Sequence, residues 1–112
     1  MANAYFKLSK STAKQPYRFN LHAPNHEIIL RSENYARKAG ALNGIESVRK
    51  NAPNDARYER KRSSDGQDMF NLTATNGQVI GTSERYRSNQ GRENGIEAVK
   101  RHAPAARVKD EA

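Results

Sequence analysis

Two stretches of the chain, residues 19–31 and 70–82, alternate between apolar and polar side chains, which is typical of strands with one buried face. A turn signal interrupts each stretch. Asn76-Gly77 predicts a hairpin whose two turn residues both have positive φ, and Asn25-His26 takes the same place in the first stretch. We therefore expect one hairpin in each stretch.

The turn sets the register of each hairpin and so the face on which every side chain lies. The side chains expected on the inner face are Phe19, Leu21, Ala23, Ile28, Leu30, Phe70, Leu72, Ala74, Val79 and Gly81. Those expected on the outer face are Asn20, His22, Ile29, Arg31, Asn71, Thr73, Ile80 and Thr82. One apolar and one polar face indicate an antiparallel sheet that is covered on one side only.

A helical pattern follows each hairpin, over residues 38–51 and 89–102, and a proline stands shortly after each segment. The apolar positions at helical spacing are Leu42, Ile45, Val48, Ile96 and Val99. Ser88 is a good N-cap for the second helix, whereas Arg37 at the matching place is a poor one. Glycine inside a helix costs about 1 kcal/mol against alanine, so Gly44 and Gly95 indicate a close approach of helix and sheet.

The chain contains an internal repeat. Residues 19–53 align without a gap on residues 70–104, and 17 of these 35 positions are identical. Upstream, residues 4–8 align with residues 56–60, and residues 106–109 form a shorter third copy of the same segment. Each repeat therefore reads strand, strand, strand, helix, strand, and the strand after the first helix also begins the second repeat.

These patterns predict an α+β fold in which two tandem β-β-β-α-β repeats form a single antiparallel sheet with two helices on one face. Either repeat alone is small for a stable core, so the two should share one core about a pseudo-two-fold axis. We expect a single domain over residues 1–112, made of repeat 1 (residues 4–56) and repeat 2 (residues 57–110).

The repeated motif runs Phe-Asn-Leu, an Asn-led turn, Ile, Ser-Glu-x-Tyr, Asn-Gly-Ile-Glu-x-Val and Asn- or His-Ala-Pro. It resembles the YegP-like family (UPF0339), small uncharacterised bacterial proteins in single-copy and duplicated forms. The duplicated form resembles this chain over nearly its whole length. The resemblance implies that the last strand of each repeat crosses into the other repeat, and that single-copy relatives reach the same arrangement as dimers. It implies no activity, substrate or catalytic residue.

The composition excludes several classes of protein. The 112 residues include no cysteine, which rules out a disulfide framework, an iron–sulfur centre, a cysteine-based zinc site and a cysteine nucleophile. No run approaches the ~20 apolar residues of a membrane span, and no secretory signal is visible. Glycine-rich phosphate loops and dinucleotide fingerprints are absent, and no cofactor is indicated. We expect a cytoplasmic protein without membrane contact.

The net charge of +8 favours an anionic partner. Residues 1–56 hold 9 basic and 4 acidic side chains and residues 57–112 hold 11 and 8, so the excess is not a basic tail. The densest basic run lies between residues 57 and 62, where Arg57, Arg60 and Arg62 are candidate contacts for nucleic-acid phosphates. The alternative is an edge strand that carries protective charge.

Catalytic and metal chemistry find little support. Glu33 and Glu84 recur in both repeats and are candidates for a symmetric carboxylate pair, as in glycoside hydrolases. His22 and His26 flank the first turn, but no third metal ligand is indicated, so no metal site is predicted. We assign no catalytic residue.

The remaining candidates form a binding surface. Tyr35 and Tyr86 precede the two helices, where each can stack on a base or pack its ring over the edge of the core. Asn20, Ile29, Arg31, Asn71 and Ile80 complete the candidate surface on the open sheet face, so that Ile29→Asp with Ile80→Asp is expected to leave the fold intact.

Three functions from different classes follow from these features. A non-enzymatic binding or interaction module is favoured, with nucleic acid (RNA or single strands) or another protein as its partner. The second is a nucleic-acid-binding protein, and the third is an enzyme with a symmetric site at Glu33 and Glu84. We expect a monomer whose internal symmetry resembles that of a dimer.

Overall fold

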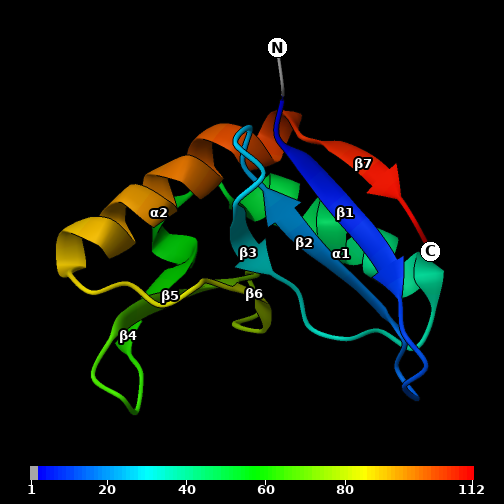
Figure 1. Cartoon of the computed structure of the whole chain (residues 1–112), viewed down its shortest axis with the longest axis horizontal. Coiled ribbons are helices and arrows are strands. Elements are labelled where there is room, and N and C mark those ends of the chain that lie inside the picture. The colour runs from blue at the N-terminus through cyan, green and yellow to red at the C-terminus, as the bar shows by residue number, and fades with distance from the viewer. Residues whose placement is uncertain (1–2) are drawn as a thin grey trace.

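The computed structural model describes residues 3–112, which form one seven-stranded sheet and two helices (Figure 1). The strands are β1 (Tyr5–Lys10), β2 (Tyr17–His22), β3 (Ile28–Arg31), β4 (Tyr58–Arg62), β5 (Asp68–Thr73), β6 (Val79–Thr82) and β7 (Arg107–Asp110). The helices are α1 (Lys38–Asn51) and α2 (Asn89–His102), each followed by a short 3₁₀ helix, η1 (Asp55–Arg57) and η2 (Ala103–Ala105). None of these helices combines the length and the apolar character that crossing a membrane requires.

The predicted α+β fold of two tandem repeats is confirmed, with one difference in the sheet. The strand order is β4-β5-β6-β3-β2-β1-β7, so β4 and β7 each pair outside the repeat whose helix they follow. The strand β7 is parallel to β1, whereas the other pairs are antiparallel. By the symmetry of the repeats β7 should lie beside β2, but β1 already occupies that edge, so β7 adds outside β1.

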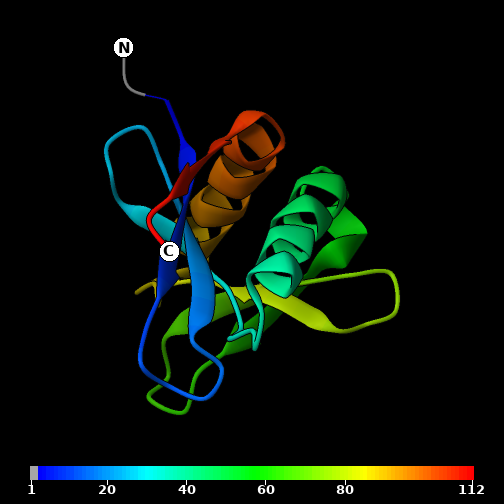
Figure 2. The ribbon, with the colours of Figure 1, turned by 90° about the vertical axis from the view of Figure 1, so that its right-hand side faces the viewer.

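Both helices cover the same face of the sheet (Figure 2). Each helix contacts strands of both repeats: α1 contacts β2, β5 and β6, and α2 contacts β5 and β3. The buried apolar side chains form one continuous cluster, whose largest members are Phe6, Phe19 and Phe70. The other sheet face is open, and strands of both repeats present polar side chains there.

The predicted helix bounds and caps are confirmed. Ser88 accepts a hydrogen bond from the Gly91 N–H at 3.1 Å. Arg37 occupies the N-cap position of α1, but its side chain forms no capping hydrogen bond. The close approach at the helix glycines is also confirmed, since a Cβ on Gly44 would lie 2.8 Å from Cζ of Tyr35. Leu42 departs from the prediction, because it is 38% exposed while Ala41 is buried in its place.

The predicted two-residue turns are wrong, because only one residue of each pair has positive φ: Gly77 at 84° and His26 at 73°. The Gly77 N–H donates to the Ala74 carbonyl and the Ala74 N–H donates to the Gln78 carbonyl, both at 2.9 Å. The loop therefore contains three residues rather than two. The register is shifted by one residue between the turn and a β-bulge, and beyond the bulge Leu72 pairs with Gly81 as predicted.

The shifted register moves two candidate site residues into the core. Leu21 pairs with Leu30 and His22 with Ile28, so Ile29 is the extra residue of a β-bulge, and Ile80 is its counterpart in repeat 2. A bulge re-aims the side chain of its extra residue. Ile29 and Ile80 are each 7% exposed and belong to the core cluster. The prediction that they lie on the open sheet face is wrong.

Candidate functional site

Tyr35 and Tyr86 lie on the helix side of the sheet, not on its open face. The Tyr35 ring stacks on Phe19 with centroids 6.2 Å apart, and Tyr86 stacks on Phe70 at 6.5 Å. Burial, with a smaller contribution from the nearby Glu33, raises the pKa of the Tyr35 hydroxyl, and burial likewise raises the pKa of Tyr86. Both rings therefore pack between the sheet and a helix. Of the two roles considered for them, packing at the core and stacking on a base, the structure shows the packing.

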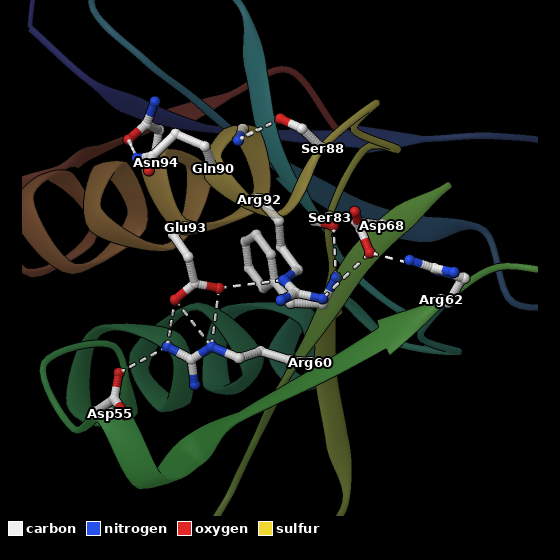
Figure 3. Close-up of polar contacts among 12 residues, drawn as sticks. Asp55, Arg60, Arg62, Asp68, Ser83, Ser88, Gln90, Arg92, Glu93 and Asn94 are labelled. Carbon is white, nitrogen blue, oxygen red and sulfur yellow. Dashed lines mark hydrogen bonds and ion pairs between the residues drawn. The ribbon is translucent and has the colours of Figure 1, made fainter. Parts of the chain in front are cut away.

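The basic run of β4 does not form one cationic surface, because its arginines point in different directions and carry acidic partners (Figure 3). Nε of Arg60 donates to both carboxylate oxygens of Glu93 at 3.0 Å, and its Nη2 donates to Asp55 at 3.1 Å. Arg62 lies 3.7 Å from Asp68, which also contacts Arg92 at 3.4 Å. The Arg60 and Arg62 charges are therefore matched by carboxylates.

This ionic network occupies the place of an apolar one in repeat 1. Arg60 aligns with Leu8 and Glu93 with Leu42, while Asp68 aligns with Tyr17. Leu8 is fully buried, because β7 flanks β1 on its outer side. In the described part of the chain, no strand lies beside the outer edge of β4, so a residue at position 60 meets water and an arginine there remains solvated. The charges also protect this open edge from pairing with another chain.

We expect Arg60 and Glu93 to be energetically coupled. Arg60→Leu and Glu93→Leu should each lower the free energy of unfolding by about 1 kcal/mol, while the double variant should cost less than their sum, since either single variant already breaks the ion pair and leaves one charge without its partner. Urea denaturation of the four proteins at neutral pH measures this coupling. Additive losses would show that the ion pair contributes nothing of its own.

The coupling should also depend on pH. The hydrogen bond from Arg60 lowers the pKa of the Glu93 carboxyl. A lowered carboxyl pKa gives stability that is complete above the unfolded value of about 4.3 and is lost as the pH falls through the lowered folded value. The same four proteins compared in acid should therefore show a smaller coupling than at neutral pH.

A polar row crosses the open face at the level of the pseudo-two-fold axis. The paired positions are, in sheet order, Glu59, Asn71, Thr82, Arg31, Asn20, Lys7 and Lys109. In repeat 2 the side chains of the row form hydrogen bonds with one another: Thr82 donates to Asn71 at 2.9 Å, and Asn71 donates to Glu59 at 3.2 Å. Arg31 pairs with Glu84 at 2.8 Å across the axis. The repeat 1 end, from Asn20 to Lys109, is the cationic part.

That cationic end contains a stacked aromatic group. The rings of Tyr5 and His22 are 4.8 Å apart and inclined by 7°. The Arg107 guanidinium and the Lys109 ammonium lie 5.9 and 5.7 Å from the centroid of the Tyr5 ring. The Tyr5 hydroxyl lies 3.1 Å from Nδ1 of His26, which fixes the ring from its far end. We call the open face of β7, β1 and β2 the Tyr5 patch: Tyr5, Lys7, Arg18, Asn20, His22, Arg107 and Lys109.

The Tyr5 patch carries more positive than negative charge. Glu111 contacts both Lys7 and Lys109, at 3.5 and 3.4 Å. Within residues 3–112, neither Arg18 nor Arg107 has a carboxylate within 4.0 Å. In repeat 2, Arg57 takes the place of Tyr5 and Thr73 that of His22, so the aromatic stack is absent there. The patch is therefore a property of one end of the sheet, not of the shared repeat.

The sequence assigns Asn20 to the candidate surface and places His22 on the same sheet face, but it does not select the other five residues of the patch. The alignment of residues 4–8 with 56–60 could have drawn attention to Tyr5, because it matches an aromatic residue in repeat 1 with Arg57 in repeat 2. Arg107 and Lys109 could not be assigned to Tyr5, since their pairing depends on β7 lying parallel to β1.

The other polar residues that recur in both repeats lie apart from the Tyr5 patch or hold the loops. Glu84 is paired with Arg31, and Glu33 lines a cavity between α1 and the β5–β6 hairpin that Glu84 does not line. Ser32 and Ser83 accept hydrogen bonds from the N–H groups of Phe19 and Phe70 at 2.9 Å, which holds the loop before each helix. No group of three or more potential metal ligands occurs in residues 3–112.

Comparisons with known proteins cover both repeats. A family model described as a domain of unknown function (DUF1508) matches residues 13–59 and again residues 63–110. A UPF0339 protein of Bordetella pertussis is 57% identical over 109 residues, 97% of this chain and 96% of the relative. The solution NMR structure of yegP from E. coli, a protein of unknown function, has a TM-score of 0.91 and 47% identity, covering 99% of this chain and 95% of that one. The solution NMR structure of a UPF0339 protein of Shewanella oneidensis has a TM-score of 0.88 and 44% identity, covering 96% of this chain and 91% of that one.

Proposed function

We propose that this chain, which belongs to the UPF0339 family of YegP-like proteins and carries its domain twice, is a non-enzymatic binding module whose ligand is single-stranded nucleic acid. The binding surface is the Tyr5 patch. The observation that carries the proposal is the Tyr5–His22 stack, which lies on an open sheet face beneath two cationic side chains.

The chemistry of the patch fits this ligand in two ways. Aromatic rings on a sheet surface stack on unpaired bases, and each such stack contributes about 1–3 kcal/mol regardless of sequence. Arg18 and Arg107, without acidic partners in the described residues, are available to the phosphates on either side of the stacked base. Asn20 and Lys7 lie between them on the same face and add hydrogen-bond donors.

Fluorescence anisotropy with a labelled single-stranded oligonucleotide of about 12 nucleotides, a length within the usual site size, tests the proposal. We expect the affinity to fall steeply between two salt concentrations, because phosphate contacts release counterions. Tyr5→Ala and Arg107→Gln should each weaken binding about tenfold or more at the lower salt concentration.

Arg87→Gln is the matched control for the charge change. Arg87 is exposed and precedes α2, about 20 Å from the end of that helix that lies nearest to Arg107. Its replacement removes the same charge and should change the affinity less than twofold. No binding at low salt, or equal losses from Arg87→Gln and Arg107→Gln, would reject the Tyr5 patch as a nucleic-acid site.

A further inference from the structure

A cavity of about 380 Å³ lies next to the Tyr5 patch. Its walls come from the segment before β1, the turn between β2 and β3, the end of α2, and the segment from η2 into β7. The polar side chains on the walls are Asn3, Arg101, His102 and Arg107, and Pro24 and three alanines complete the lining.

The lining is cationic. It contains two arginines, a histidine and an amide, and no acidic side chain. Within residues 3–112, neither Arg101 nor Arg107 forms an ion pair. The C-terminus of a helix carries roughly half a negative charge, so the two full positive charges outweigh that of α2.

Arg107 connects the cavity with the Tyr5 patch. The residue lines the cavity, and its guanidinium also lies 5.9 Å from the centroid of the Tyr5 ring. A nucleotide bound at the Tyr5 patch can therefore bring a phosphate to Arg107 at the edge of the cavity. A nucleic-acid strand can cross the Tyr5 patch in either direction, because the patch is a sheet surface. The cavity, by contrast, is a recess at one end of the patch.

We propose that this cavity binds the terminal phosphomonoester of a nucleic-acid strand, with Arg101, His102 and Arg107 as its donors. This inference rests on the proposed function and extends it from single strands in general to strand ends. A phosphomonoester carries between about 1.5 and 2 negative charges at pH 7 and three acceptor oxygens, more than an internal phosphodiester offers. A recess with several cationic donors discriminates between these two groups, and a flat surface does not.

The test compares oligonucleotides of one sequence that differ only at their ends: a 5′-phosphate, a 3′-phosphate, or hydroxyls at both ends. We expect one of the two phosphorylated strands to bind about tenfold more tightly than the hydroxyl-ended strand, the gain of a hydrogen-bonded charged group. The phosphorylated end that gains affinity identifies the polarity of the strand on the patch.

Two variants assign the effect to the cavity. Arg101→Gln should abolish the gain from the terminal phosphate and leave the affinity for the hydroxyl-ended strand within twofold. Arg87→Gln, at the other end of α2, should leave the gain intact. Circular dichroism of both variants checks that the fold is unchanged.

The outcomes separate this inference from the proposed function. If all three strands bind the unmodified protein equally, the cavity does not read strand ends, and the Tyr5 patch remains a nucleic-acid site. If the gain survives Arg101→Gln, the phosphate is held elsewhere and the assignment to the cavity is wrong. If none of the strands binds, the proposed function fails, and this inference fails with it.

Discussion

Ile29→Asp and Ile80→Asp should each destabilise the fold by about 4 kcal/mol or more. Truncating a buried isoleucine costs about 2–5 kcal/mol, and a carboxylate placed in the core without a partner adds its desolvation. Both isoleucines are 7% exposed and lie at β-bulges that turn them into the shared core. A domain of ordinary stability has only about 5–15 kcal/mol to lose, so the double variant should be unfolded.

Asn20→Asp is the matched control, because Asn20 follows the same alternation and lies on the open face of β2. Its change in unfolding free energy should stay within about 0.5 kcal/mol, as for most surface substitutions. Urea denaturation followed by far-UV circular dichroism measures both effects. Equal, small losses at Asn20 and Ile29 would mean that Ile29 lies on the open face, as the alternation alone predicts.

Gly44→Ala should lower the free energy of unfolding by about 2 kcal/mol, although alanine is the better helix former. A Cβ at this position would lie 2.8 Å from Cζ of Tyr35 and 3.0 Å from Cε2 of Phe19, both in rigid, stacked rings. Overpacking of this kind costs about 1–3 kcal/mol or more, which outweighs the gain in helix propensity of about 1 kcal/mol. Gly95→Ala should behave in the same way, since its Cβ would lie 2.7 Å from Cζ of Tyr86.

The same helix supplies the control. A Cβ on Gly40 would lie 3.4 Å from the nearest atom of Tyr35, an ordinary contact, so Gly40→Ala should leave stability unchanged or raise it by up to about 1 kcal/mol. Thermal and urea denaturation should therefore show a loss of stability for Gly44→Ala and none for Gly40→Ala. A stabilising Gly44→Ala would mean that the Tyr35 ring can move away, and that the close packing of helix and sheet is not what requires glycine.

Local patterns were sufficient wherever a feature depends on neighbours in the chain. The helices over 38–51 and 89–102 follow from apolar spacing and from the proline after each. The Ser88 cap needs only the side chain and the N–H three residues later. The burial of Phe19 and Phe70 on the helix side of the sheet follows from the alternation of apolar and polar residues, because both residues precede the bulge in their hairpin.

The candidate surface was predicted less well, because it depends on how the turns close and which strands meet. A three-residue turn in place of a two-residue turn moved Ile29 and Ile80 from the open face to the core. The sequence presents Arg60 as a cation available to a ligand, but in the structure it donates two hydrogen bonds to Glu93, which lies 33 residues away in the sequence. The partners of Tyr5 come from β2 and β7, at opposite ends of the chain.

The sequence by itself determined that two copies of one β-β-β-α-β unit share a core, because a repeated pattern of apolar positions needs no knowledge of distant contacts. Only the tertiary structure decided what lies on the open face. Strand β7 has to settle outside β1, since the edge of β2 is already taken, and this places Arg107 and Lys109 over Tyr5 at one end of the sheet. In the described residues, the outer edge of β4 at the other end is unpaired, and carboxylates balance the charges of Arg60 and Arg62 there. Competition between strands for an edge is a property of the assembled sheet, so the difference between the two ends appears only in three dimensions.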